Sequence, residues 1–510
     1  MKLVTAQQMS ELEQCAIQEY GIDGLLLMEN AARSFCDALE SFFGSCCQKQ
    51  IVVFCGKGNN GGDGFAISRH LYNRGADVTV VTTCNPKELK QDARKNFEII
   101  CRMEIPIASL QDVAGKSFDL VIDALLGTGF SGAVRPFMKD LINAVNQTGG
   151  KVISVDVPSG ACCLDGSVSE PCVCADVTVT FGLAKPGHYL YPAKEYCGKV
   201  VVTDISLPKN LLSQFSADFY TLDGSLSAFL PKRKENSHKG SFGKVLVFAG
   251  STGMSGAALM ATTAVLKTGA GMVTAAVPDT ICEIFSANLP EAMTLSLRTE
   301  NEVLLEASAN LIKEKLKTQD VLLAGCGLGT SETAKKALLA VLESCEKPMV
   351  IDADGINALS GHIYKVKNKT VPAILTPHPL EFSRISGLSV DYIQQNRLQV
   401  AQDFAKEFGV VLVLKGADTI VAHPDGEVYI ATQSNSGLAK AGSGDVLAGV
   451  IAALLAQGAT PKDGANLGVY IHSLAGMMVR NRLGAYSMTA TDVIATLPET
   501  LEKLAQTEQE

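Results

Sequence analysis

The sequence predicts an α/β protein built from two parallel-sheet domains in tandem. Short β-branched runs alternate with longer segments of helical spacing along the 510 residues, which is typical of parallel sheets covered on both faces. The chain exceeds the length at which one hydrophobic core stops growing, so at least two domains are expected. Between residues 207 and 243 the alternation gives way to Pro, Gly and charged residues, which indicates a linker.

The elements of the first half follow in order. A helix is expected at residues 6–20, with Thr5 as its N-cap and an apolar stripe that packs against the sheet or a partner subunit. Helices are also expected at residues 65–73 and 136–146. The β-branched runs predict strands at residues 51–54, 78–82, 120–122, 152–155 and 177–181.

The second half resumes the alternation after a charged run at 232–235, which we interpret as solvated surface. A long helix rich in small residues is expected after Gly444. Strands are predicted at residues 244–248, 272–277, 321–324, 349–351, 373–375, 411–414 and 419–422.

Composition narrows the class of protein. The 47% apolar and 19% charged content is ordinary for a buried α/β enzyme, and the net charge of −9 argues against nucleic-acid binding. The longest apolar stretch, 446–456, is too short to span a membrane, and no apolar signal-peptide core is present, so a cytoplasmic protein is expected. The fifteen cysteines show no C-x-x-C spacing, which favours reduced thiols over disulfides or a metal site.

Three segments follow predicted strands of the first half, at residues 56–64, 123–132 and 156–160. Ligands of open parallel sheets bind beyond the carboxyl ends of the strands. Glycines allow a backbone to approach a phosphate closely, and an aspartate can handle a proton. Each segment alone would be interpreted as a turn or a cap, but three together predict a binding site. The spacing Gly61-Gly62-Asp63-Gly64 does not match the simple dinucleotide fingerprint.

The run Gly58-Asn59-Asn60-Gly61-Gly62-Asp63-Gly64, together with the Asp123 and Asp156 segments, resembles the NAD(P)H-hydrate epimerase domain over residues 1–215. The resemblance implies a Rossmann-like three-layer sandwich that binds hydrated NADH or NADPH. It implies Asp156 as the catalytic acid/base, and a potassium ion held by Asn60, Asp123 and Ser159. The substrate-binding residues that it implies are Asn59, Asn60, Gly61, Gly62, Asp63, Gly127, Thr128, Gly129, Phe130, Ser131, Gly132, Ala133 and Asp156.

The second half carries a glycine-rich segment at 435–445 that leads into a predicted helix. Backbone N–H groups at a helix start form an anion site by geometry and dipole. Asp445 stands one residue inside it, where a base could take a proton from a substrate hydroxyl. The alternative is that Asp445 only complements the helix dipole.

This segment resembles the anion hole of the ribokinase-like superfamily. With GSTGMSGA at 250–257, GCGLG at 325–329, DADGINA at 352–358, TPHPLEF at 376–382 and KGADT at 415–419, it looks like an ADP-dependent NAD(P)H-hydrate dehydratase domain at 225–505. Cys326 stands where that family usually has proline, and Leu380 where it usually has glycine. The resemblance implies Asp445 as the catalytic base, with Ala257, Gly329, His378, Glu381, Arg384 and Asp445 at the hydrated cofactor. It implies ADP binding by Lys415, Gly416, Ala417, Asp418, Thr419, Asn435, Ser436, Gly437, Leu438, Ala439, Lys440, Ala441, Gly442, Ser443 and Gly444.

The two resemblances imply a fused repair enzyme. One domain epimerises the R and S forms of hydrated NADH or NADPH, and the other dehydrates the S form at the expense of ADP, yielding AMP and phosphate. Magnesium is expected where phosphoryl groups move, and the apolar helices favour a homo-oligomer. Two alternatives stay open: a vitamin or sugar kinase with a regulatory first domain, and a nucleotide sensor without turnover. The polar triplet Asn60, Asp123 and Ser159 favours a catalytic first domain.

Overall fold

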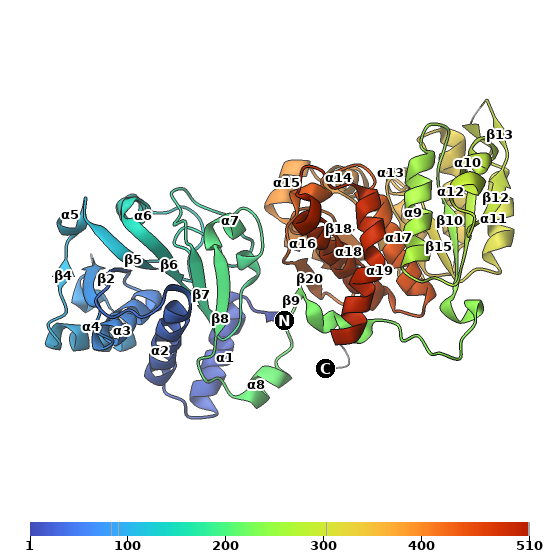
Figure 1. Cartoon of the computed structure of the whole chain (residues 1–510). Helices are drawn as coiled ribbons and strands as arrows, with labels where there is room; N and C mark the ends of the chain where they lie inside the picture. Colours follow the sequence, from blue (N-terminus) through green and yellow to red (C-terminus); the bar gives the residue numbers. More distant parts are fainter. Residues whose placement is uncertain (83, 90, 302, 508–510) are drawn as a thin grey trace. The chain divides into compact units, whose positions relative to one another are not determined.

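The computed structural model describes residues 1–82, 84–89, 91–301 and 303–507. The chain divides into two compact units, Lys2–Phe219 and Tyr220–Glu510, with Met1 belonging to the latter (Figure 1). Each unit is a parallel or largely parallel sheet flanked by helices, which confirms the predicted α/β fold class. Within the described residues, no helix combines the length and the apolar content that crossing a membrane requires.

The first unit is built on a seven-stranded sheet in the order β4-β3-β2-β5-β6-β7-β8, parallel throughout and Rossmann-like. Its strands are β2 (Gln50–Cys55), β3 (Asp77–Thr82), β4 (Ile107–Ala108), β5 (Ser117–Ala124), β6 (Gly149–Val155), β7 (Val177–Phe181) and β8 (Lys199–Thr203). Its helices are α1 (Ala6–Gln18), α2 (Gly24–Phe43), α3 (Asn59–Asn73), α4 (Gln91–Arg102), α5 (Leu110–Val113), α6 (Pro136–Gln147), α7 (Ala193–Cys197) and α8 (Lys209–Gln214).

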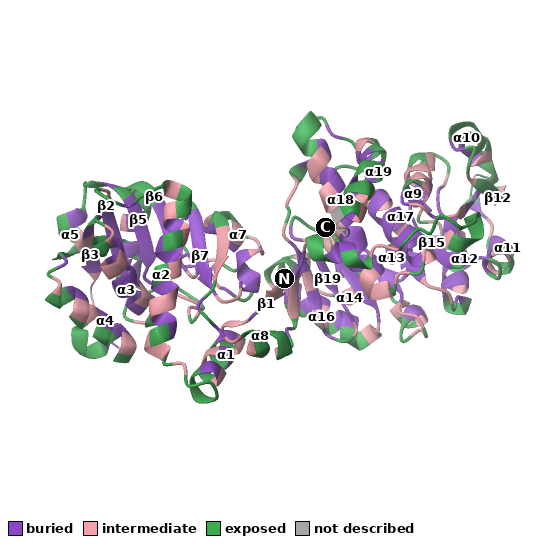
Figure 2. Cartoon of the chain, turned by 60° about the horizontal axis from the view of Figure 1, so that its bottom comes forward, coloured by how far each residue is buried: buried purple, intermediate pink, exposed green. Residues whose placement is uncertain are grey.

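Both faces of this sheet are buried, as continuous apolar strands require. Ile51 and Val53 lie in one core cluster with residues of α1, α2, α3 and α4, whereas Val52 and Phe54 lie in another with residues of α5 and α6. The central strands therefore appear as buried ribbons in Figure 2. α1 begins after Thr5, whose side chain forms the predicted N-cap within a capping box.

The second unit contains a long mixed sheet in which the order β20-β19-β18-β17-β16-β15-β10-β11-β12 is continuous. Its strands are β9 (Phe219–Leu222), β10 (Lys244–Phe248), β11 (Met272–Pro278), β12 (Met293–Leu297), β15 (Val321–Ala324), β16 (Met349–Ile351), β17 (Ile374–Leu375), β18 (Val411–Leu414), β19 (Ile420–Ala422) and β20 (Val428–Ala431), with β13 (Thr299–Glu300) and β14 (Val303–Leu304) as a separate pair. Strands β16 to β18 are parallel, and β18, β19 and β20 are antiparallel.

The helices of this unit cover the sheet on both faces. They are α9 (Ser255–Lys267), α10 (Cys282–Asn288), α11 (Ser308–Leu316), α12 (Glu332–Ser344), α13 (Asp354–Ala358), α14 (Pro379–Ser386), α15 (Val390–Gln395), α16 (Arg397–Phe408), α17 (Ser443–Ala456), α18 (Pro461–Leu483) and α19 (Ala490–Thr507). The long apolar helix predicted after Gly444 is α17, which lies between α9, α18 and the sheet. Gly449 permits this contact, because a Cβ there would lie 2.4 Å from the Ala261 carbonyl oxygen of α9.

Two element predictions need correction. The linker predicted at 207–243 contains α8, β9 and two short 3-10 helices, because Leu222 and Leu226 are buried and order the segment. The strands β4, β8, β9, β12, β13, β14 and β20 were not predicted. The fifteen cysteines all lie within the described ranges, and none of them is joined to another in a disulfide there.

Candidate active sites

The three segments singled out in the first half lie side by side. They follow β2, β5 and β6, which are neighbours in the parallel sheet and end at the same edge. The Gly56 N–H donates to the Ala124 carbonyl (2.9 Å), and the Leu126 N–H donates to the Ser159 hydroxyl oxygen (2.8 Å). The Asn60 amide donates to the Leu126 carbonyl (2.9 Å). The predicted convergence at this edge is therefore present.

The segment predicted as a loop through Gly64 is helical from Asn59 onward, with Gly58 as the N-cap. The reason is close packing: a Cβ on Gly61 would lie 1.8 Å from the Gly56 carbonyl oxygen, and one on Gly64 would lie 2.7 Å from the Ala124 Cβ. These glycines bring the start of α3 against the sheet rather than supplying a left-handed turn. The N–H groups of the first helical turn thereby lie at the strand ends, where an anion is favoured.

Asp123 is the most buried acid of this edge. Its carboxylate accepts hydrogen bonds from the Ser154 hydroxyl (2.9 Å), the Ser159 hydroxyl (2.6 Å), the Ser159 N–H (2.8 Å) and the Leu125 N–H (3.2 Å). Burial raises the pKa of Asp123, and the hydrogen bonds from Ser159 oppose that rise. Within the described part of the chain, no lysine or arginine pairs with Asp123, so its charge is compensated by dipoles alone.

Asp156 begins the third segment with a φ of +66°, which an L-residue adopts at a cost. Its carboxylate accepts from the Lys185 ammonium (2.6 Å) and the Thr180 hydroxyl (2.7 Å). Burial alone would raise the pKa of Asp156, but Lys185 and Thr180 hold it below its ordinary value. Lys185 itself is 1% exposed, so this is a buried ion pair.

His188 also contacts Asp156, through the backbone carbonyl of that residue. Its Nε2 lies 2.8 Å from the Asp156 carbonyl oxygen, and its Nδ1 accepts from the Lys185 N–H (3.1 Å). A carbonyl can only accept and an N–H can only donate, so the neutral ring carries its proton on Nε2. Burial lowers the pKa of His188 to about 4, which agrees with a neutral ring.

The pKa of a second acid at this edge, Asp63, shifts in the opposite direction. Burial raises the pKa of Asp63 well above its ordinary value, and the neighbouring charges of Asp156 and Glu13 add to the rise. Glu13, on α1, also has a raised pKa because of its burial. The edge therefore combines an acid with a lowered pKa, Asp156, with acids whose pKa values are raised, an arrangement that acid–base catalysis uses.

The remaining predicted residues of this site, 127–133, form the turn after β5. The Phe130 N–H donates to the Gly127 carbonyl (3.0 Å), and a Cβ on Gly127 would lie 3.0 Å from the Asn60 Cβ. Gly129 and residues 131–133 are exposed. The turn thus borders the same edge and faces solvent, as a ligand-contacting loop requires.

In the second unit, the ends of β15, β16 and β18 gather acids and a lysine at the start of α17. The Cys326 sulfur and the carboxylate oxygens of Asp352 and Asp445 all lie within 4.8 Å of one another. The Lys415 ammonium lies 2.7 Å from the Asp352 carboxylate and 3.9 Å from that of Glu381. A Cβ on Gly444 would lie 3.1 Å from the same ammonium, so α17 starts directly against it.

Asp445 is the titratable centre of this cluster. Burial and the neighbouring Asp352 charge raise its pKa to about 7, while Cys326 and Lys415 oppose the rise. A carboxyl group with a pKa near neutrality can exchange protons with a substrate at working pH. Asp445 therefore has the property that a general base needs, which a plain dipole-complementing aspartate would not have.

The other predicted substrate residues border this cluster. His378 caps α14 by accepting from the Leu380 and Glu381 N–H groups (both 3.2 Å), and Glu381 accepts from the His378 N–H (2.9 Å). Arg384 donates to the Asn357 side chain (2.6 Å). The Gly329 N–H donates to Asp354 (2.8 Å). The half-exposed His378 ring has a lowered pKa, mainly because of its partial burial.

Ala257 lies on α9 against the segment at 325–329. A Cβ on Gly327 would lie 2.8 Å from the Ala257 Cβ, so only glycine fits at that position. Gly327 also has a φ of +60°, in the left-handed region that favours glycine. Ala257 therefore lies directly against the turn that contains Cys326.

Two predicted nucleotide residues have structural partners. Asp418 is buried and forms an ion pair with Arg397 (Oδ1 to Nε, 3.2 Å). Lys440 donates to the carbonyls of Tyr486 (2.7 Å) and Met488 (2.8 Å). Both side chains are therefore already engaged with other parts of the second unit.

The rest of the predicted nucleotide segment, 435–444, leads into the start of α17. Asn435 accepts from the Gly437 N–H (3.0 Å) and donates to the Gly476 carbonyl (2.9 Å), which fixes the 3-10 turn Ser436–Leu438. Gly442 has a φ of +91° and caps α17. The Ser443 hydroxyl lies 3.3 Å from Nε2 of the buried His472.

Several residues of these sites had no role predicted from the sequence, among them Glu13, Thr180, Lys185, His188, Asp352 and Asp354. Asp352 directly follows a strand, so the rule that found Asp123 and Asp156 could have found it. Thr180 and Lys185 stand at and just beyond the end of β7, and the same rule applies less directly. Glu13 lies on a helix that precedes the sheet, and no local signal marks it.

Comparison with known proteins gives relatives over the whole chain. The NAD(P)H-hydrate dehydratase family model matches residues 245–499, and the YjeF-related protein N-terminus model matches residues 24–187. The chain is 40% identical over 518 residues to the bifunctional NAD(P)H-hydrate repair enzyme Nnr of Moorella thermoacetica, covering 99% of this chain and 98% of that protein. It is 36% identical to the protein of that name from Escherichia coli, covering 89% and 86%.

A solved structure is also similar. It is the ADP/ATP-dependent NAD(P)H-hydrate dehydratase from Bacillus subtilis, co-crystallised with ATP and Mg²⁺, at 28% identity and a TM-score of 0.50. The match covers 57% of this chain and 100% of that chain.

Proposed function

The chain belongs to the family of bifunctional NAD(P)H-hydrate repair enzymes, and we propose that its two units divide the two reactions. The first unit epimerises the R and S forms of hydrated NADH or NADPH. The second unit dehydrates the S form at the expense of ADP, yielding AMP and phosphate. The observation that carries the proposal is Asp445, a carboxyl group with a pKa of about 7 at the start of a glycine-capped helix.

In the second unit, the Asp445 carboxylate takes the proton of the ring hydroxyl. The hydroxyl oxygen forms a bond to the terminal phosphorus of ADP, and the bond from that phosphorus to AMP breaks. Phosphate then leaves the ring carbon and a neighbouring carbon loses a proton to water, which restores the ring double bond. Backbone N–H groups at the start of α17 stabilise the phosphoryl charge, and Lys415 lies against them.

Magnesium would assist by neutralising phosphate charge. The ligand atoms of the cluster formed by Cys326, Asp352 and Asp445 indicate how a magnesium ion would be held. Cys326 offers sulfur among Asp352 and Asp445, and Mg²⁺ prefers oxygen ligands and keeps several waters. We propose that the nucleotide phosphates supply most of its ligands, with one carboxylate at most from the protein.

In the first unit, Asp156 is the acid/base at the hydrated ring carbon. Lys185 keeps it ionised, and Thr180 and His188 fix its direction. Asp63, whose pKa is raised by burial, would give a proton to the departing hydroxyl, which leaves as water; when water adds back to the ring carbon, the Asp156 carboxylate would take the proton that it releases. Asn59 to Asp63 and the turn at 127–133 would contact the rest of the nucleotide.

A potassium ion fits the neighbouring triplet. Asn60 and Ser159 both hydrogen-bond to the Leu126 backbone, and the Ser159 hydroxyl donates to Asp123. The three residues offer amide, hydroxyl and carboxylate oxygens, which suit a hard cation. Asp123 is buried without a lysine or arginine partner among the described residues, so a cation there would offset its charge.

The test uses the full chain and a mixture of R and S hydrated NADH, followed by the absorbance of the reduced nicotinamide ring. Complete recovery with ADP is expected, because epimerisation feeds the S form to dehydration. Asp445→Asn should stop recovery while R and S forms still interconvert. With Asp156→Asn, only the S form should be recovered, because the R form is no longer converted into it. Phosphorylation of a vitamin or sugar without any recovery would instead identify a kinase.

A further inference from the structure

The segment 415–419 joins β18 to β19 and is most exposed at its tip. Gly416 and Ala417 are exposed, whereas Asp418 is buried. At the beginning of the segment, the Lys415 ammonium lies 3.1 Å from the place that a Cβ on Gly444 would take. The segment therefore borders the start of α17, where the proposed reaction needs the nucleotide phosphates.

Arg397 contacts this segment from the interior of the second unit. It is the first residue of α16 and is 7% exposed. Its Nη2 donates to the backbone carbonyls of Leu414 (3.2 Å), Lys415 (3.4 Å) and Asp418 (3.3 Å). Its Nε lies 3.2 Å from Oδ1 of Asp418, and its Nη1 donates to the Gln394 side chain (2.8 Å). One buried guanidinium thus contacts the backbone at both ends of the segment, which its planar fork of donors permits.

Gly416 shows how closely the guanidinium approaches the segment. A Cβ on Gly416 would lie 2.5 Å from Nη2 of Arg397, so a side chain at this position would displace the guanidinium. The Gly416 N–H donates to the Thr419 hydroxyl oxygen (3.3 Å), and that hydroxyl donates to the Gly416 carbonyl (3.0 Å). The turn is therefore closed by Thr419 and fixed from its buried side by Arg397.

We infer that Arg397 is a positioning residue of the dehydratase, which holds the segment 415–419 in the shape that takes the adenine nucleotide. The inference rests on the proposed function. It also gives Asp418 a different role from the one that the sequence resemblance implies, because its buried carboxylate acts through Arg397 and not on the nucleotide. A loop that already has its bound shape binds more tightly, since it loses less conformational entropy when the ligand arrives.

The test separates the ion pair from the backbone contacts by using variants of the full chain. Arg397→Met and Asp418→Leu each leave one charge buried without its partner and should lower the thermal unfolding temperature of the second unit. The double variant removes both charges, so its unfolding temperature should return toward that of the wild type. It still lacks donors for the three carbonyls, so we expect the KM for ADP to stay raised by about tenfold or more, with a smaller change in kcat.

Arg397→Lys gives a second measurement that does not depend on the double variant. Lysine keeps a positive charge beside Asp418, but its ammonium is compact and cannot replace the planar fork of donors. We expect this variant to raise the KM for ADP in the same direction. Its epimerase activity should equal that of the wild type, because that activity is proposed for the other unit.

An arginine that serves only as half of an ion pair predicts a double variant with both wild-type stability and wild-type KM. That result, or a wild-type KM in Arg397→Lys, would overturn the inference. The dissociation constant for ADP, measured by calorimetry without the hydrated coenzyme, keeps the two proposals apart. A wild type that binds ADP but recovers no NADH removes the proposed function, while the ADP affinities of the variants still decide the role of Arg397.

Discussion

Replacement of Lys185 by methionine should damage the first unit specifically. The Lys185 ammonium lies 2.6 Å from the Asp156 carboxylate, and the two side chains are 1% and 15% exposed. Methionine keeps most of the chain length and removes the charge. It would leave the Asp156 carboxylate buried without its cation, beside the raised-pKa acids Asp63 and Glu13.

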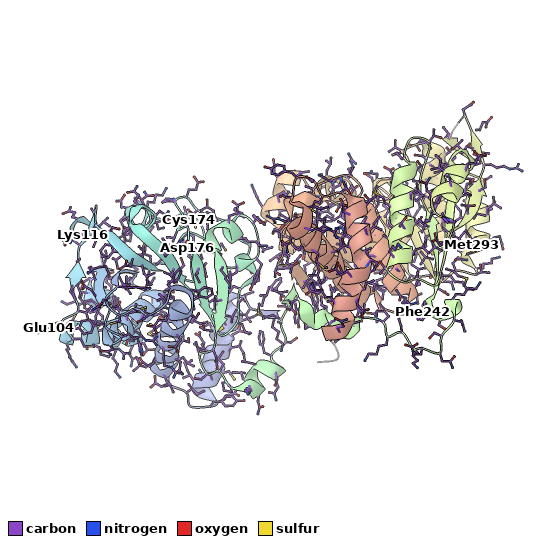
Figure 3. The ribbon with its side chains drawn as sticks, viewed as in Figure 1. Glu104, Lys116, Cys174, Asp176, Phe242 and Met293 are labelled. Carbon is purple, nitrogen blue, oxygen red and sulfur yellow. The ribbon has the colours of Figure 1, made fainter. Side chains whose placement is uncertain are left out.

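The size of the effect follows from burial. Removing one partner of a buried ion pair costs about 3–5 kcal/mol, because the other charge stays desolvated. The exposed pair of Lys151 and Asp176 has the same geometry, at 2.8 Å, but its side chains are 59% and 36% exposed. Asp176 is labelled in Figure 3. Lys151→Met should therefore cost about 1 kcal/mol or less, and it serves as the matched control.

The pH dependence has a defined sign. In the wild type the pKa of Asp156 is lowered, so its contribution to stability is complete above the unfolded pKa and is lost as pH falls through the folded one. Without Lys185, burial prevails and the pKa of Asp156 rises. The variant then becomes less stable as pH increases, so its deficit should shrink when the pH is lowered from about 8 to about 5.

Native-state hydrogen exchange of the β6 and β7 amides measures the unfolding free energy of this unit apart from the other. Epimerisation should fall with the stability loss, whereas dehydration of the S form should persist as the internal control. The reasoning would be refuted by a Lys185→Met protein with exchange rates like those of Lys151→Met, or by a deficit that grows on acidification.

Four further outcomes are expected. The rate of dehydration should fall as the pH drops below about 7, where Asp445 becomes protonated. Asp445→Asn should lower that rate by about 10²–10⁴-fold at all pH values. Both effects are measured by the absorbance of the reduced ring, with epimerisation as the control. Asp156→Asn should abolish epimerisation, followed by chromatographic separation of the R and S forms, with dehydration unchanged. Replacing potassium by sodium, or introducing Asn60→Ala, should reduce epimerisation and potassium-dependent thermal protection but spare dehydration. Gly61→Ala should prevent stable folding of the first unit because its Cβ would meet backbone at 1.8 Å, while Gly58→Ala, with nothing within 4 Å, should fold normally by circular dichroism.

Residues that follow a strand were predictable in kind and in place. Buried parallel strands are recognisable in a sequence as apolar runs, and ligands bind at their carboxyl ends. These two rules placed Asp123, Asp156 and the segment at 56–64 at one edge of the sheet. Asp352 also follows a strand directly, but no role was predicted for it. The rule says nothing about which of several acids carries a proton, since that depends on burial and on partners distant in sequence.

Short or weakly patterned elements were not predictable. β4 (Ile107–Ala108) has two residues, too few to display alternation, and it was not predicted, whereas β17 (Ile374–Leu375) was predicted within the apolar run 373–375. Helix α3 was predicted too short because Gly61, Gly62 and Gly64 disfavour helix locally. Tertiary packing overrides that preference, since only glycine lets this helix approach the sheet so closely.

In both sites, several acids lie near a single buried lysine. Each holds two or more acids where strands end, and a single buried lysine cannot neutralise all of them: Lys185 pairs with Asp156, and Lys415 pairs with Asp352. The acid left outside the pair, Asp63 or Asp445, has its pKa raised by burial and by its ionised neighbour. In the first unit this places an acid with a lowered pKa near one with a raised pKa, which suits reversible removal and return of a hydroxyl. In the second unit the unpaired acid stays near half ionisation, which suits a base that accepts one proton and releases it to water.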